Sequence, residues 1–143
     1  MPRFFSLLEA ESLLPEVERL LRNIVRSKLD LQTSDAELSE IAQRIALLGG
    51  SLVPRDRLLQ IRARKESAAR SLKSIVSRVQ EIGCQLKDVE SGLVDFPTLY
   101  RGEEVYLCWK LGEPSITSWH HVADGFAGRR PIDSEFLQNH RGD

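Results

Sequence analysis

The side chains best suited to chemistry lie in the last third of the chain. Glu113 and His120 stand on either side of a short turn that contains Pro114, so their side chains can converge. One imidazole with carboxylates suits a divalent metal ion, and Trp109 and Trp119 would exclude water around it. Further carboxylate donors are Asp88, Glu90, Asp95 and Asp124. The spacing matches no established ligand motif, so a metal-free protein is the favoured expectation.

The histidine and the two cysteines also have plainer interpretations. His120 would hydrogen-bond to Glu113 or to a backbone carbonyl as a half-buried histidine. Cys108 lies in an expected strand with no histidine paired to it nearby in the sequence, which is typical of a packed thiol rather than a nucleophile. Cys84 is expected in the core. On this interpretation none of these groups is reactive.

Two arginines, Arg129 and Arg130, follow a Gly-Phe-Ala-Gly stretch at residues 125–128. Glycines there would let backbone N–H groups and a guanidinium turn toward an anion such as a phosphate or a carboxylate. The glycine spacing is not that of a P-loop. A salt bridge from Arg129 to Asp95 or Glu113 is the alternative. A small anionic ligand is therefore one possible partner.

Length and composition narrow the class of protein. The 143 residues suit one domain, and the formal net charge of −1 argues against a dedicated nucleic-acid binder. Two cysteines are too few for a disulfide framework, and Glu9 and Glu11 interrupt the amino-terminal apolar residues before a signal peptide could form. No apolar run approaches the roughly 20 residues of a membrane span. A cytoplasmic protein is expected.

The elements that must position these groups begin with two long helices, residues 15–48 and 54–82. Their apolar residues recur in steps of four and three, as in helices packed lengthwise. The stripes are Val17, Leu21, Ile24, Leu31, Leu38, Ala42 and Ile45, then Leu58, Ile61, Lys65, Ala68, Leu72, Ile75, Val79 and Ile82. Pro15 suits a first helical turn, so residues 1–14 are expected to form a lead-in strand and turn. The short connection makes the helices antiparallel and places Asp35 near Lys65.

A small sheet with loops is expected at residues 84–132, because apolar residues alternate after Gly83. Strands are expected at 84–90, 103–111 and 116–120, with turns at Gly92 and at 97–102. Phe4 and Phe5 would add a fourth strand, and residues 133–143 would be a tail. The strand register stays open, and a slip of one residue would exchange the two faces.

The tip of the expected hairpin is more apolar than a monomer usually exposes. Its residues are Ile41, Leu47, Leu48, Leu52, Val53 and Leu59. A partner would cover them, most simply a second copy of the chain. The expected partner is therefore another copy, bound through the hairpin as a homodimer.

The second helix is basic and the first is richer in acidic residues. The basic residues are Arg55, Arg57, Arg62, Arg64, Lys65, Arg70, Lys73 and Arg78. A one-sided basic stripe would contact nucleic acid, whereas ion pairs with the acidic helix need no ligand. The pairing interpretation is favoured.

Several motifs together resemble an uncharacterised bacterial family known as domain of unknown function 2203. They are Glu9-Ala10, Leu14-Pro15, Gly83-Cys84, Lys87-Asp88, Gly92-Leu93-Val94-Asp95-Phe96-Pro97, Leu107-Cys108-Trp109-Lys110-Leu111-Gly112-Glu113, Trp119-His120, Gly125-Phe126 and Gly128-Arg129. The resemblance covers nearly the whole chain and implies a fold family but no activity. His121 stands where this family's pattern would have an acidic residue.

The fold class expected is α+β: one domain, residues 1–143, in which a long antiparallel helical hairpin packs on an antiparallel sheet of three to four strands. The function expected is a dimerising interaction or ligand-binding module without catalysis. The candidate ligand-binding residues are Asp88, Glu90, Asp95, Trp109, Glu113, Trp119, His120 and Arg129. The alternatives are a metal-dependent hydrolase that uses Glu113 and His120, and a nucleic-acid adaptor that uses residues 54–82.

Overall fold

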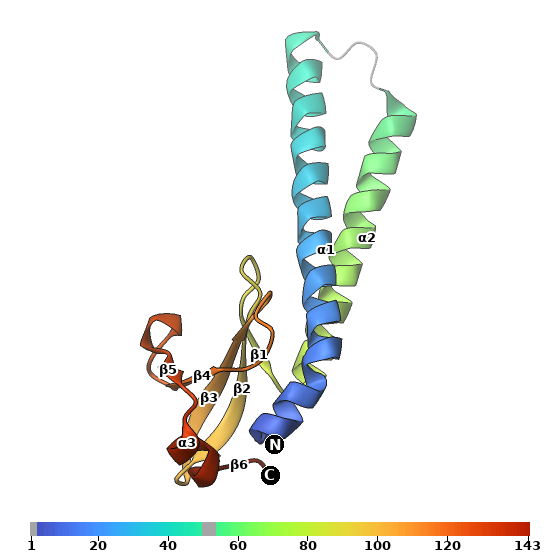
Figure 1. Cartoon of the computed structure of the whole chain (residues 1–143). Coiled ribbons are helices and arrows are strands. Elements are labelled where there is room, and N and C mark those ends of the chain that lie inside the picture. The colour runs from blue at the N-terminus through green and yellow to red at the C-terminus, as the bar shows by residue number, and fades with distance from the viewer. Residues whose placement is uncertain (1–2, 50–53) are drawn as a thin grey trace. The chain divides into compact units, whose positions relative to one another are not determined.

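The computed structural model describes residues 3–49 and 54–143 and confirms the α+β class. Its elements are α1 (Leu7–Leu47), α2 (Arg55–Ile82), β1 (Gln85–Asp88), β2 (Leu93–Tyr100), β3 (Glu103–Lys110), β4 (Ser118–His121), the 3-10 helix η1 (Phe126–Gly128), β5 (Arg130–Pro131), α3 (Ser134–Asn139) and β6 (His140–Arg141) (Figure 1). The chain forms two compact units, Met1–Arg22 with Val76–Asp143, and Asn23–Ile75. None of the described helices has the length and apolar content to cross a membrane.

The first helix starts at Leu7, so the expected start at Pro15 and the lead-in turn before it are wrong. The signal is a capping box: the backbone N–H of Glu9 donates to the Ser6 hydroxyl, and the backbone N–H of Ser6 donates to the Glu9 carboxylate. Pro15 therefore lies inside α1, where it lacks the N–H that a helix interior uses. Figure 1 shows the first turns of α1, drawn in dark blue, inclined to the turns that follow.

The stripe expected on the second helix is confirmed by burial, since Ile61, Ala68, Val79 and Ile82 are buried and the intervening stripe residues are half-buried. On α1 the expected stripe is wrong at one position. Ile41 is buried there, whereas the expected residue, Ala42, is exposed.

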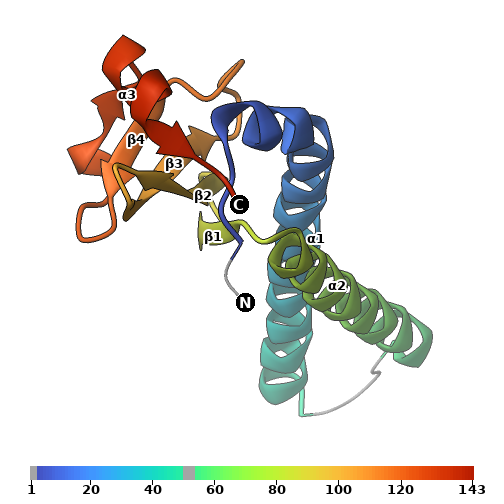
Figure 2. The same cartoon turned by 90° about the horizontal axis from the view of Figure 1, so that it is seen from below.

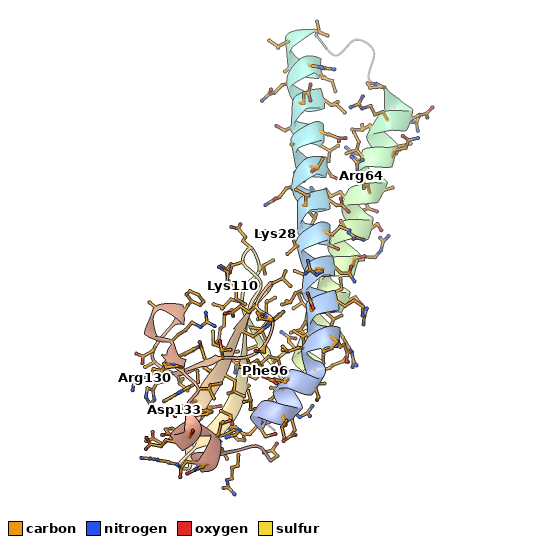
Figure 3. All side chains as sticks on the ribbon, in the orientation of Figure 1. Lys28, Arg64, Phe96, Lys110, Arg130 and Asp133 are labelled. Carbon is orange, nitrogen blue, oxygen red and sulfur yellow. The ribbon has the colours of Figure 1, made fainter. Side chains whose placement is uncertain are left out.

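Ion pairs join α1 and α2 within the unit Asn23–Ile75. The expected pair of Asp35 and Lys65 is confirmed at 2.6 Å. Arg64, labelled on α2 in Figure 3, bonds the Ser34 hydroxyl and the Glu37 carboxylate. The turn expected at residues 49–53 lies largely outside the described residues, and so do Leu52 and Val53.

Within the described residues the sheet has six strands rather than three or four, in the order β1-β2-β3-β4-β5, with β6 beside β2. Strand β2 covers part of the turn expected at residues 97–102. The real turn is the pair Arg101 and Gly102, whose φ angles of 52° and 82° suit a two-residue hairpin. The strand expected at residues 116–120 begins later, at Ser118.

Pro97 is accommodated inside β2 because its missing N–H faces a gap between neighbouring strands. On that side β1 pairs as far as Asp95, and β6 pairs from Leu99 onward. Between them the Phe5 N–H donates to the Pro97 carbonyl at 2.7 Å. Phe5 thus bonds to the sheet's backbone, and the Phe4 carbonyl accepts the Asp143 N–H, but neither residue forms the expected fourth strand.

The carboxy-terminal residues 133–143 are ordered elements and not the expected tail. The Asp133 carboxylate caps α3 by accepting the Phe136 N–H. Phe136 is fully buried and stacks on Tyr100 and Trp119. Figure 2 shows α3 beside β4, where that stack forms.

The two faces of the sheet differ in character. One carries the buried side chains Val94, Phe96, Val105, Leu107 and Trp109. Phe5 meets Phe96, labelled in Figure 3, edge to face on this side. The opposite face carries the polar side chains of Asp95, Cys108 and His120.

Candidate functional site

The strand register places Asp95, Cys108 and His120 on one face of the sheet. Asp95 on β2 is directly opposite Cys108 on β3, and Tyr106, two residues earlier on β3, is opposite His120 on β4. Side chains two residues apart on a strand share a face, so all four project to the same side. Three strands therefore bring together residues that are far apart in the sequence.

Asp95 and His120 form a buried hydrogen-bonded pair. The His120 Nε2 lies 3.0 Å and 3.1 Å from the two Asp95 carboxylate oxygens, and the side chains are only 4% and 2% exposed for His120 and Asp95 respectively. The His120 Nδ1 lies 2.8 Å from the backbone carbonyl of His121. A carbonyl oxygen only accepts, so Nδ1 carries a proton and donates it. A second proton must lie between Nε2 and the carboxylate, since both otherwise present lone pairs.

Cys108 completes a three-residue cluster with this pair. A ligating atom from each of Asp95, Cys108 and His120 lies within 4.8 Å of the other two. Burial, and then the negative charge of Asp95, raise the pKa of the Cys108 thiol to about 12. At neutral pH this cysteine is a thiol and a poor nucleophile, as the sequence predicts.

A pocket of about 270 Å³ opens over the Asp95–His120 pair. Its apolar wall residues are Leu93, Tyr106, Val122, Ala123 and Phe126. Lys87 and Asp124 add one charge of each sign, and the Lys87 ammonium lies 4.9 Å from the centre of the Tyr106 ring. The acid–imidazole pair therefore forms the polar floor of a largely apolar pocket.

Glu113 and Arg129 form a second polar group beside the pocket. The Arg129 guanidinium donates to both Glu113 carboxylate oxygens at 2.9 Å, and the Lys110 N–H donates to one of them at 2.7 Å. The same guanidinium lies 4.6 Å from the centre of the Phe126 ring. This arrangement confirms the salt-bridge interpretation of Arg129, with Glu113 as the partner. The carboxylate holds Arg129 against a wall of the pocket.

The candidate ligand-binding residues lie in four places: the pocket floor, the salt bridge, the β1–β2 turn and the opposite face of the sheet. Asp95 and His120 lie in the pocket floor, while Glu113 and Arg129 form the bridge, so Glu113 and His120 each have a different partner. Asp88 and Glu90 lie at the β1–β2 turn, where the Asp88 carboxylate accepts the Glu90 N–H.

The two tryptophans belong to the opposite face of the sheet. Trp109 is buried there and donates its indole N–H to the Glu113 carbonyl, and Trp119 stacks on Phe136. Neither tryptophan is among the described residues that line the pocket. The large aromatic rings that line the pocket are instead those of Tyr106 and Phe126.

Sequence reasoning missed Lys87, Tyr106 and Phe126 as pocket residues and treated Cys108 as isolated. The signal for Tyr106 was its spacing of two from Cys108, which puts both on one strand face. Phe126 belongs to the Gly-Phe-Ala-Gly stretch that was singled out for its glycines, but the loop after β4 has no periodicity from which the position of its ring could be predicted.

Comparison of the chain with curated proteins and with solved structures finds no match. A family model described as "Uncharacterized conserved protein (DUF2203)" matches residues 3–132, which is most of the chain. The expected family is thereby confirmed, and the chain belongs to the DUF2203 family of uncharacterized conserved proteins.

Proposed function

We propose that the chain is a binding module that takes a small anionic ligand in the pocket over the Asp95–His120 pair. The pocket itself supports this proposal, with about 270 Å³ of space above a buried, hydrogen-bonded polar floor. At about 30 Å³ per water molecule, that space equals roughly nine waters. A small metabolite with an apolar body suits it.

The charges around the pocket favour an anion. Lys87 lines the wall, and the Lys110 ammonium lies 5.6 Å from the centre of the Phe126 ring. Arg129 also lies over that ring, but Glu113 balances its charge. Asp124 opposes the lysines, which favours a ligand with one anionic group over a more highly charged one.

The experiment is amide chemical-shift mapping with benzoate and phenyl phosphate as two anionic probes of similar body. Saturable shifts should gather at Tyr106, His120 and residues 122–126. Lys87→Ala should weaken binding by about tenfold, the equivalent of one charge-assisted hydrogen bond. Lys73→Ala removes an exposed lysine on α2 as the matched control and should change nothing. Shifts confined to other residues, or equal binding by Lys87→Ala, would overturn the proposal.

The dimerisation part of the proposal rests on exposed leucines in the unit Asn23–Ile75. Leu29 is 60% exposed on α1, Leu47 is 84% exposed near its end, and Leu59 is 52% exposed on α2. Two copies that pack these helices together would remove the leucines from water. Sedimentation at tens of micromolar tests this, and a monomer at that concentration would refute it.

Four contacts weigh against the alternative functions. On α2 both Arg64 and Lys65 have acidic partners on α1, which gives part of the basic helix a role without nucleic acid. Glu113 is bound by Arg129 and His120 by Asp95, so a hydrolase that joins Glu113 to His120 would first have to break both contacts. The binding module needs neither change.

A further inference from the structure

We propose that Asp95, Cys108 and His120 bind a divalent transition-metal ion of the zinc type. The site lies in the floor of the pocket already proposed for a small ligand, so the inference deepens that proposed function. It differs from the pairing of Glu113 with His120 that the sequence suggests. Its test needs the metal alone, and the two proposals can therefore fail separately.

The chemistry of the three donors matches that ion. Zinc is bound by histidine nitrogen, cysteine sulfur and carboxylate oxygen, and sites that keep three protein ligands leave a fourth position open. The three donor atoms lie within 4.8 Å of one another, and all three residues are buried. Burial matters because it holds the side chains in place before the ion arrives.

The orientation of His120 is the second observation. Its Nδ1 donates to the His121 carbonyl, the contact that typically orients a metal-binding imidazole. The opposite nitrogen, Nε2, therefore directs its lone pair at the Asp95 carboxylate. Two lone pairs at 3.0 Å repel each other unless a cation lies between them. A proton meets that need in the free protein, and a metal ion can take its place.

The distances require little rearrangement. Bonds of about 2.1 Å from a tetrahedral zinc ion separate nitrogen and oxygen ligands by about 3.4 Å. The His120–Asp95 contacts of 3.0 Å and 3.1 Å would open by a few tenths of an ångström. The Cys108 sulfur now lies within 4.8 Å of the other two donors and would lie about 3.6 Å from them, given zinc–sulfur bonds of about 2.3 Å.

The buried charge also balances. One proton lies between His120 and Asp95, and Cys108 keeps its thiol proton at neutral pH because its pKa is raised to about 12. A divalent ion would displace these two protons to solvent and bring the same total charge to the site. Both Asp95 and His120 line the pocket, so the open position faces it. A ligand anion held there would coordinate the ion directly.

Cobalt(II) titration with absorption spectroscopy tests the proposal. The protein is purified without an affinity tag, stripped with a chelator and kept reduced. Tetrahedral coordination should give intense visible d–d bands, and the Cys108 sulfur should give a charge-transfer band in the near ultraviolet. Zinc should then displace cobalt at one equivalent. Absence of both bands would overturn the proposal.

Matched variants identify the ligands. Cys108→Ser should abolish the charge-transfer band, and Cys84→Ser, at the other buried cysteine, should keep it. His120→Gln and Asp95→Asn should each weaken cobalt binding by more than roughly 100-fold, because loss of an outer partner alone costs roughly 10- to 100-fold. Glu113→Gln should leave the spectrum unchanged.

Two results would assign the metal elsewhere and overturn the proposal. One is an unchanged band in Cys108→Ser; the other is lost binding in Glu113→Gln with retained binding in His120→Gln. Thermal unfolding of each variant checks that it is folded. Benzoate binding by the metal-free protein would uphold the pocket even if cobalt failed to bind.

Discussion

Replacement of Asp95 by leucine should reveal how much the buried pair contributes to folding. The two side chains have the same number of heavy atoms, so the change removes the carboxylate without leaving a large cavity. The His120 Nε2 loses its acceptor, and the His120 side chain is only 4% exposed. Breaking a buried pair by removing one partner costs about 3–5 kcal/mol. We take the lower end, about 3 kcal/mol, because the leucine side chain fills the place of the carboxylate.

Asp95→Asn should cost much less, about 1 kcal/mol or below. The asparagine amide can donate to the His120 Nε2 while Nδ1 keeps its proton on the His121 carbonyl. Every buried polar atom of the pair then keeps a partner. The contrast between leucine and asparagine separates the hydrogen bond from the charge.

The assay is urea unfolding at neutral pH with a chelator present, because a bound metal ion would add its own stabilisation. The midpoint should shift for Asp95→Leu at an unchanged m-value. The melting temperature should fall by roughly 10 °C, at about 3 °C per kcal/mol for a chain of this size. Asp124→Leu, an exposed carboxylate in the same pocket, should stay within about 0.5 kcal/mol. A loss under 0.5 kcal/mol for Asp95→Leu, or equal losses for leucine and asparagine, would refute the reasoning.

Burial raises the pKa of Cys84 to about 11 and that of Cys108 to about 12 from 9.0, so both thiols should resist alkylation at pH 8 until the protein unfolds. As the pH rises, the unfolded chain releases these protons before the folded protein does. The free energy of unfolding should therefore stay constant below pH 9 and fall between pH 9 and pH 11 for Cys84 and pH 12 for Cys108. The expected slope is about 1.4 kcal/mol per pH unit for each thiol. Rapid alkylation of the native protein would contradict the first expectation. An unchanged fall of the free energy of unfolding with alkaline pH in Cys84→Ala would contradict the second. Phe136→Ala should lose about 3–5 kcal/mol in urea unfolding, because the ring is fully buried between Tyr100 and Trp119. Lys65→Ala should lower the free energy of unfolding by less than about 1 kcal/mol, because its ion pair is solvent-exposed. Similar losses for Phe136→Ala and Lys65→Ala would show that the carboxy-terminal segment is not part of the core.

The helices were the most predictable part of the molecule. Seven-residue periodicity predicts a helix from local spacing alone, and the stripe on α2 matches the buried positions. The start of α1 was predictable too, because Ser6 and Glu9 have capping-box spacing. Pro15 outweighed that signal in the prediction, although a helix with strong packing on both sides can retain an interior proline.

The sheet was harder to predict because its strands depend on distant partners. Pro97 normally argues against a central strand, and β2 tolerates it only because Phe5 occupies the gap beside it. Phe136 orders the last residues by stacking on side chains from β2 and β4. Neither the contact of Phe5 with β2 nor the stack of Phe136 can be predicted from the sequence of the segment that it stabilises.

The sequence by itself determined the α+β class, the family, the long helices, the packed character of both cysteines and the pairing of Asp35 with Lys65. Each depends on local periodicity, on composition or on a short motif. Only the tertiary structure decided that His120 meets Asp95 and Cys108 while Glu113 holds Arg129. The physical reason is strand register, since a slip of one residue would send Asp95 or His120 to the other face of the sheet. That register is set by contacts among distant strands, so the pocket and its polar floor appear only when the chain is folded.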